Sequence, residues 1–156
     1  MIEKKRDVKL SRPESFGWLV AVLGSQMASA LDKKLKEMNL NLGLWPTLFA
    51  LWEEEGLTQA DLAVRCQTEN YTTTRVIDSL EKLELVERKK HPTSRRAYQV
   101  FLTDKGHALE EEATTAAITC NDEFLSVLSE TEKKQINELL VKIISGRNGS
   151  IIPRIE

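Results

Sequence analysis

Five basic residues within nine positions are the feature of this sequence with the clearest chemistry. The segment 88–96 reads RKKHPTSRR, and no acidic residue interrupts it. The whole chain has a formal net charge of −2, so the basic segment stands against an acidic background. Guanidinium and ammonium groups clustered in this way can bind the phosphates of a polyanion. The alternative is a solvated Lys/Arg-rich turn, and the surrounding elements must decide between the two.

The basic segment lies between two short runs that favour β-strands. Residues 85–88 (LVER) and 97–102 (AYQVFL) flank His91–Ser94, which has the proline and small polar residues typical of a turn. This pattern predicts a β-hairpin whose loop presents the basic side chains.

Two short helices are predicted immediately before the hairpin. Thr58 is a good N-cap for the first helix, because Asp61 lies three residues further on and can complete a capping box. Thr68 is expected to cap the second helix, which would run to Leu83. Two short helices joined by a tight turn and followed by a hairpin form a winged helix-turn-helix.

The second short helix is narrow enough to enter the major groove of DNA, and the hairpin can place cations on phosphates or in the adjacent minor groove. The exposed side chains of this helix offer donors and acceptors to base edges, while Thr74 is expected to seat the helix or touch a phosphate. The predicted DNA-contacting residues are Asn70, Tyr71, Thr72, Thr74, Arg75, Arg88, Lys89, Lys90, Arg95 and Arg96.

Three of these residues have a local alternative. Arg75 could instead pair with Asp78 or Ser79 along its own helix. Tyr71 could pack locally. Arg88 could pair with a neighbouring acid, as strand-edge arginines often do.

A long helix is predicted near the N-terminus. Apolar residues spaced three and four apart predict one amphipathic helix over 13–38, with Pro13 in its first turn. The preceding ten residues are expected to form a polar, mobile tail. The almost continuously apolar run 44–52 predicts a buried helix, in which Pro46 is tolerated because it falls in the first turn.

Two further helices are predicted after the hairpin. Thr103 is expected to cap a helix that runs from Asp104 to about Leu128. Ser129, with an acid three residues on, predicts a capping box for a last helix that ends at Gly146 and Gly149. The predicted fold class is therefore mainly α-helical with a small β-hairpin.

The ordered motifs of these elements resemble those of the MarR-type family of regulators over roughly residues 12–145. The motifs are LTQADLA at 57–63, TRVIDSLEKL at 74–83, LVER at 85–88, SRRA at 94–97 and LTDKG at 102–106.

This resemblance implies a homodimeric winged helix-turn-helix transcription factor, expected to repress transcription from pseudo-palindromic sites. Members of the family are often released from DNA by a small, frequently aromatic effector. The implied domains are an N-terminal tail and dimerisation helix (1–42), a DNA-binding domain (43–103) and C-terminal dimerisation helices (104–156).

Two positions depart from the family's pattern. The family usually has Asp just before the arginine pair of the wing, which helps to hold the wing arginine, and this chain has Ser94 there. The wing is then looser, or another group orients Arg95. The family also favours Gly after the recognition helix, where this chain has Glu84. A non-Gly residue in the left-handed conformation costs about 1 kcal/mol.

Four aromatic residues of the first two predicted helices are candidates for an effector pocket between the dimer stem and the DNA-binding lobe. An apolar pocket with a few polar groups is the usual form of a small-molecule site. The alternative is packing in the core or at the dimer interface. The candidates are Trp18, Trp45, Phe49 and Trp52.

The sequence does not favour redox, metal or catalytic chemistry. Cys66 and Cys120 are expected to be buried, inert thiols of a protein in the reducing cytoplasm. With only His91 and His107, no histidine metal site is expected within one chain, and no Gly-rich phosphate loop is present. We therefore expect no cofactor, no metal and no enzymatic activity.

The N-terminal segment has charges without an apolar stretch before Phe16, which argues against a secretory signal. No apolar run approaches the roughly 20 residues of a membrane-spanning helix, so no membrane partner is expected. The main alternative function is a winged-helix module for protein–protein contact. A basic wing and a polar recognition helix argue against it.

Overall fold

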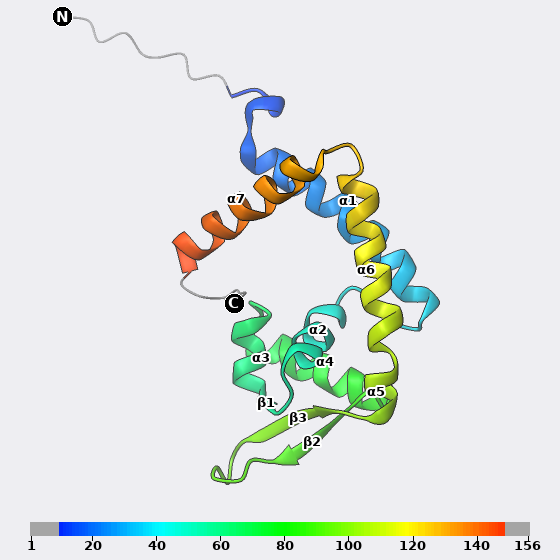
Figure 1. The fold of residues 1–156 in the computed structure, drawn as a ribbon. Helices are drawn as coiled ribbons and strands as arrows, with labels where there is room; N and C mark the ends of the chain where they lie inside the picture. The colour runs from blue at the N-terminus through cyan, green and yellow to red at the C-terminus, as the bar shows by residue number, and fades with distance from the viewer. Residues whose placement is uncertain (1–9, 149–156) are drawn as a thin grey trace, which may run out of the picture.

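The computed structural model describes residues 10–148, which form seven α-helices, one 3-10 turn and a three-stranded antiparallel sheet (Figure 1). This architecture confirms the predicted fold class. The first half comprises η1 (Arg12–Glu14), α1 (Phe16–Glu37), α2 (Trp45–Glu53), β1 (Leu57–Thr58), α3 (Gln59–Arg65) and α4 (Asn70–Lys82). The second half comprises β2 (Val86–Lys90), β3 (Tyr98–Leu102), α5 (Asp104–Ala108), α6 (Glu110–Leu125) and α7 (Glu130–Asn148).

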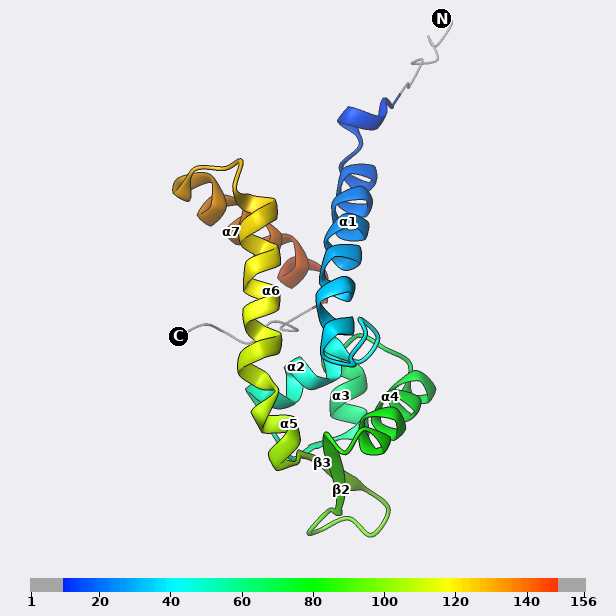
Figure 2. The ribbon, with the colours of Figure 1, turned by 90° about the vertical axis from the view of Figure 1, so that its right-hand side faces the viewer.

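The helices α1, α6 and α7 form a stem above a lobe that contains α2 to α5 and the sheet. Figures 1 and 2 show α1 and α6 beside each other, with α7 leaving from the far end of α6. An ion pair between Lys34 Nζ and Glu123 Oε1, at 3.6 Å, links α1 to α6. The two ends of the described chain therefore meet in the stem, while its middle builds the lobe.

The start of α1 differs from the prediction. Pro13 lies in the separate 3-10 turn η1, and α1 begins only at Phe16. Ser15 is the N-cap, and its hydroxyl accepts a hydrogen bond from the backbone N–H of Trp18 at 3.3 Å. The predicted helix over 13–38 is thus three residues too long at its start, because a serine cap two residues after the proline ends one turn and begins the next.

The hydrophobic core of the lobe joins α2, α3 and α4 to the sheet and to the C-terminal end of α1. Each element contributes aliphatic side chains that are almost completely removed from water, and each such side chain stabilises the fold by roughly 1.5–3 kcal/mol. The least exposed core residues are Leu35, Leu48, Leu51, Leu62, Ile77, Leu80 and Val100. The helix predicted over 44–52 is buried along most of its surface, although Phe49 remains 43% exposed.

The predicted hairpin is confirmed, and a short third strand completes the sheet. β2 pairs antiparallel with β3, and Lys90 lies opposite Tyr98 at the end of the ladder next to the loop. β1 pairs with the other edge of β3, where Leu57 lies opposite Val100. Two residues are too few for a recognisable alternating pattern, so β1 could not be predicted from the sequence.

The second short helix, α4, is followed by a residue in the left-handed conformation. This is Glu84, where the resembled family favours glycine. Glu84 has a φ of 60°, and the N–H of Leu85 donates to the carbonyl of Leu80 at 3.0 Å. This is a Schellman arrangement, which satisfies the carbonyls at the end of a helix. The chain therefore adopts the left-handed conformation at this position without a glycine.

The helix predicted from Asp104 to about Leu128 is two helices, and the predicted single helix is wrong. Thr103 caps α5 as expected, because its hydroxyl accepts a hydrogen bond from the N–H of Gly106 at 3.1 Å. The indole N–H of Trp52 donates to the carbonyl of Gly106 at 3.0 Å. That carbonyl is the acceptor that a continuous helix would use at residue 110, so the tertiary contact favours a break at Leu109.

The last helix begins as predicted. The hydroxyl of Ser129 accepts from the N–H of Glu132, and the Glu132 carboxylate accepts from the N–H of Ser129 at 2.8 Å. This backbone hydrogen bond lowers the pKa of Glu132. α7 continues through Gly146 to Asn148, so Gly146 does not end it, and Gly149 lies outside the described residues.

The predicted mobile tail falls largely on residues 1–9, outside the described part of the chain. Within residues 10–148, no helix is both long enough and apolar enough to cross a lipid bilayer.

Candidate nucleic-acid interface

The first short helix, α3, begins with the predicted capping box. The hydroxyl of Thr58 accepts from the N–H of Asp61 at 3.2 Å, and the Asp61 carboxylate accepts from the N–H of Thr58 at 2.9 Å. Hydrogen bonds from Thr58 lower the pKa of Asp61. The backbone N–H groups of Thr58 and Asp61, which have no partner within the helix, are therefore both hydrogen-bonded. This fixes the direction in which α3 begins.

The predicted cap of the second short helix is wrong. α4 begins at Asn70, and its N-cap is Glu69, whose side chain makes no capping hydrogen bond among the described residues. The hydroxyl of Thr68 instead lies 2.8 Å from that of Thr73, a buried residue in the first turn. Thr68 thus links the turn between α3 and α4 to a side chain of α4 and does not cap the helix end.

α4 has one buried and one exposed face. Thr73, Ile77 and Leu80 point into the lobe at spacings of four and three, which is the pattern of an amphipathic helix. The side chains predicted to face DNA at its N-terminal end are all exposed, and they are Asn70, Tyr71, Thr72 and Arg75. The start of α4 therefore presents polar groups to the outside of the lobe.

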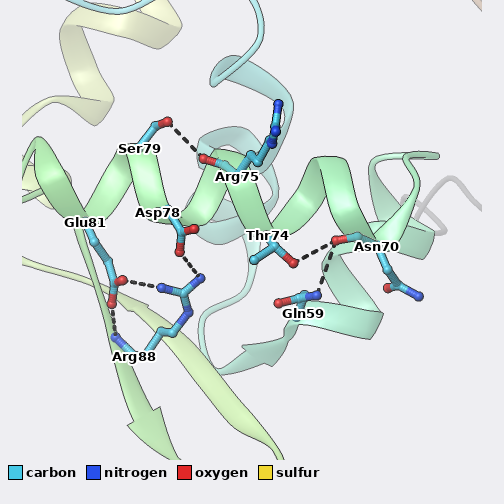
Figure 3. Close-up of polar contacts among 8 residues, drawn as sticks. All are labelled: Gln59, Asn70, Thr74, Arg75, Asp78, Ser79, Glu81 and Arg88. Atoms are coloured by element: carbon cyan, nitrogen blue, oxygen red, sulfur yellow. Dashed lines mark hydrogen bonds and ion pairs between the residues drawn. The ribbon is translucent and has the colours of Figure 1, made fainter.

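Arg75 is held by an aromatic ring. Its guanidinium carbon lies 4.4 Å from the centroid of the Tyr71 ring, within the range of a cation–π contact. Ser79 hydrogen-bonds the backbone carbonyl of Arg75 at 2.9 Å, so the predicted side-chain alternative does not form with Ser79. Asp78, the other alternative partner, is engaged by Arg88. Figure 3 shows the Arg75 side chain directed away from Arg88.

Thr74 and Gln59 converge on one backbone carbonyl at the start of α4. The hydroxyl of Thr74 donates to the carbonyl of Asn70 at 2.9 Å, and Nε2 of Gln59 donates to the same oxygen at 3.3 Å (Figure 3). Thr74 is half-buried, which suits the predicted seating role. The Gln59 bond ties α3 to α4 and was not predicted, because it joins two helices.

Arg88 faces α4 rather than solvent. Its guanidinium pairs with Asp78 at 2.7 Å and with Glu81, while its backbone N–H donates to Glu81 at 3.2 Å (Figure 3). Its side chain is only 22% exposed. The sequence placed Arg88 among the DNA contacts, but the structure forms the alternative pairing with neighbouring acids. Arg88 therefore joins β2 of the wing to the recognition helix.

We expect Arg88→Ala to lower the free energy of unfolding by about 1–2 kcal/mol, because charged hydrogen bonds to two partly exposed carboxylates are lost. Chemical denaturation monitored by circular dichroism measures this change. Lys89→Ala is the matched control, since it removes the same charge from the next residue of β2, where the ammonium pairs with one exposed carboxylate, that of Glu87. Equal midpoints for the two variants would contradict a tether at Arg88.

The remaining basic residues form the wing surface, which we define as Lys90, Arg95 and Arg96. All three are exposed, and among the described residues none forms an ion pair. Lys89 is less available, because its ammonium pairs with Glu87 at 2.8 Å and lies 4.8 Å from the ring centroid of Phe101.

A hollow of about 480 Å³ separates the wing from the recognition helix. Residues of β1, α3, α4 and β3 line it together with Arg88 of β2 and Arg96 of the hairpin loop. The polar lining residues are Thr58, Gln59, Asn70, Arg88, Arg96 and Tyr98. The exposed start of α4 and the wing surface therefore lie on opposite sides of a concave surface.

Of the four aromatic residues proposed for an effector pocket, three lie together and Trp18 lies apart from them. Trp45 stacks on Phe49 with ring centroids 5.4 Å apart and meets Trp52 edge-on at 5.8 Å. Trp18 is at the N-terminal end of α1, which Figures 1 and 2 place far from α2. Trp45 and Trp52 pack against the core, so the alternative of core packing holds for these two.

Both cysteines lie in surroundings that disfavour the thiolate. Cys120 is buried in α6, and Cys66 is half-buried at the end of α3, with its sulfur 4.0 Å from the hydroxyl of Thr47. Burial raises the pKa of both thiols. Thiols of raised pKa are poor nucleophiles at neutral pH, in agreement with the prediction of inert cysteines, although the predicted burial is complete only for Cys120.

Comparison with known sequences places this lobe in one family. The family model described as MarR family matches residues 40–98, from the end of the stem to the start of β3. Transcriptional repressor MprA of Escherichia coli K12 is 30% identical over 153 residues, which cover 92% of this chain and 87% of MprA. The HTH-type transcriptional regulator MgrA of Staphylococcus aureus is 26% identical over 115 residues, covering 72% of this chain and 76% of MgrA.

Solved structures share the arrangement of stem and lobe. A MarR transcriptional regulator from Methanosarcina mazei Go1 matches with a TM-score of 0.80 and 26% identity, covering 83% of this chain and 94% of that one. The S. aureus MepR–DNA complex matches with a TM-score of 0.77 and 27% identity, covering 85% of this chain and 98% of MepR.

Proposed function

This chain belongs to the MarR family of transcriptional regulators, and we propose that it represses transcription as a homodimer bound to a duplex operator. The observation that carries the proposal is the position of the exposed start of α4 beside the cationic wing surface on one lobe. α4 would enter the major groove, and the wing would lie on phosphates or in the adjacent minor groove. Two such lobes read half-sites about one helical turn apart, roughly 34–36 Å.

The proposed base-reading residues are Asn70, Tyr71, Thr72 and Arg75, and the proposed phosphate contacts are Lys90, Arg95 and Arg96. Thr74 seats the start of α4, and Lys89 is a secondary cation because it is already paired with Glu87. We assign Arg88 a structural role as the tether between wing and helix.

The homodimer is supported by apolar surface on the stem. Large apolar side chains on the N-terminal half of α1 and along α7 are exposed in the single chain, and a second copy would cover them. They include Phe16, Leu19, Val20, Leu23, Leu139, Leu140, Ile143 and Ile144. Contiguous exposed apolar surface of this kind marks an interface. Residues 1–42 and 104–156 would then form the dimerisation region, with 43–103 as the DNA-binding domain.

A small, aromatic effector would act where the stem meets the lobe. Trp45 and Phe49 offer a stacked aromatic surface there, and Phe49 is 43% exposed. A ligand that favours one spacing of the two recognition helices needs to supply only about 1–3 kcal/mol of coupling to change operator occupancy. We propose no catalytic activity and no cofactor, and we propose that the regulator acts in the cytoplasm.

The first experiment is selection of duplexes from a random pool by the purified protein, with affinities measured at two salt concentrations. Enrichment of a pseudo-palindrome with a steep salt dependence is the expected result. Salt-sensitive binding without an enriched site would indicate a non-specific DNA binder. Absence of binding by a folded, ligand-free dimer would reject the proposal in favour of protein–protein contact through the winged helix.

We expect Arg95→Ala and Arg96→Ala to reduce the salt dependence of DNA binding. Each lost phosphate contact lowers the slope of log K against log salt by about 0.9, because fewer counterions are released. Lys142→Ala, an exposed change on α7, is the control for loss of one positive charge far from the wing. An unchanged slope in both arginine variants would show that the wing does not lie on the phosphates.

A further inference from the structure

His91 occupies the first position of the wing loop and holds the loop with both its backbone and its side chain. Its backbone N–H donates to the carbonyl of Ala97 at 3.1 Å and closes the loop. Its Nδ1 lies 3.3 Å from the backbone N of Thr93 and 3.2 Å from that of Ser94. The hydroxyl of Thr93 is also 3.3 Å from the same nitrogen.

These contacts define the tautomer of the neutral ring. Two backbone N–H groups can only donate, so Nδ1 must be an acceptor, and the neutral ring must carry its proton on Nε2. The geometry is that of an Asx turn, in which a side-chain acceptor three bonds from Cα gathers the N–H groups of the following residues. Here an imidazole nitrogen takes the place of the Asn or Asp oxygen.

The position of this turn connects it to the wing surface. Ser94 directly precedes Arg95 and Arg96. An acceptor from the start of the loop, which holds the backbone N–H of Ser94, therefore orders the backbone that leads into the two arginines.

We propose that His91 is the positioning residue of the wing: its Nδ1 orders the turn at Thr93 and Ser94 and so presents Arg95 and Arg96 to the DNA backbone. This inference rests on the proposed function. Pre-ordering a loop raises affinity because less conformational entropy is lost on binding.

The test compares three substitutions of His91. His91→Asn keeps an acceptor at the δ position, His91→Gln moves the acceptor one bond further out, and His91→Ala removes it. We expect His91→Asn to bind the selected duplex within about twofold of the wild type, and the other two to bind about fivefold more weakly, with unchanged unfolding midpoints. Equal affinity of all four proteins would overturn the proposal. Equal weakening of all three variants would also overturn it, because the ring itself would then be the contact.

A second measurement addresses the hydrogen bonds on the free protein. A side-chain ¹H–¹⁵N correlation spectrum above neutral pH should show His91 as the Nε2–H tautomer, with Nδ1 unprotonated. An Nδ1–H tautomer would overturn the proposal. This measurement needs no DNA, so a wild type that binds no duplex would count against the proposed function, while the tautomer would still decide the turn.

Discussion

Leu140→Glu should convert the dimer into monomers. Leu140 lies on α7 among large apolar side chains that the single chain leaves exposed, and 36% of its own surface is accessible. In the homodimer the substitution would remove the burial of the exposed third of two leucines, about 1–2 kcal/mol together, and would introduce two carboxylates into apolar surroundings. Dimerisation should weaken by several orders of magnitude. Light scattering at low micromolar concentration measures the mass.

Gln135→Glu is the matched control for this prediction. It introduces the same charge on the same helix at an exposed polar position, and the dimer should persist. Circular dichroism should show that Leu140→Glu keeps its helices, because the lobe has a separate core. A Leu140→Glu protein that remains dimeric would place the interface elsewhere on the stem.

Arg75→Ala should weaken binding to the selected operator and flatten the discrimination between operator and mutated sites. A guanidinium that forms two hydrogen bonds to guanine is worth about 1–3 kcal/mol of discrimination, and a dimer carries two copies. The cation–π contact with Tyr71 holds the guanidinium in one region at the exposed start of α4, which reduces the entropy lost on binding. Competition binding with duplexes substituted at single positions measures the effect.

Lys82→Ala is the control for Arg75, because it removes one positive charge from the exposed opposite end of α4. It should change the salt dependence slightly and leave base discrimination intact. If Arg75→Ala retained both the affinity and the discrimination of the wild type, Arg75 would not read bases.

The features that the sequence predicted well are those set by neighbouring residues. The capping boxes at Thr58 and Ser129 form as expected, because each needs only residues three apart in a helical turn. The hairpin and the buried face of α4 follow from periodicities of two and of three to four residues. The left-handed Glu84 was anticipated from a departure in a known motif.

The predictions that failed concern contacts between distant segments. Thr68 is not the cap of α4, since its hydroxyl is taken by a side chain of the next turn. The break at Leu109 accompanies a hydrogen bond from Trp52, more than fifty residues earlier in the chain. Trp18 is separated from the other candidate aromatics because α1 is long and straight enough to carry it away from α2.

The candidate interface shows the same division. Residue types and their order determined that this chain has a polar recognition helix and a cationic wing. They also determined the family of regulators to which it belongs. Only the tertiary structure decided which cations are free to meet DNA: Arg88 is neutralised by Asp78 and Glu81 of α4, while Arg95 and Arg96 project from the loop. The physical reason is that a charge is available only where folding has brought no opposite charge beside it, and that proximity is set by packing between elements rather than by spacing along the chain.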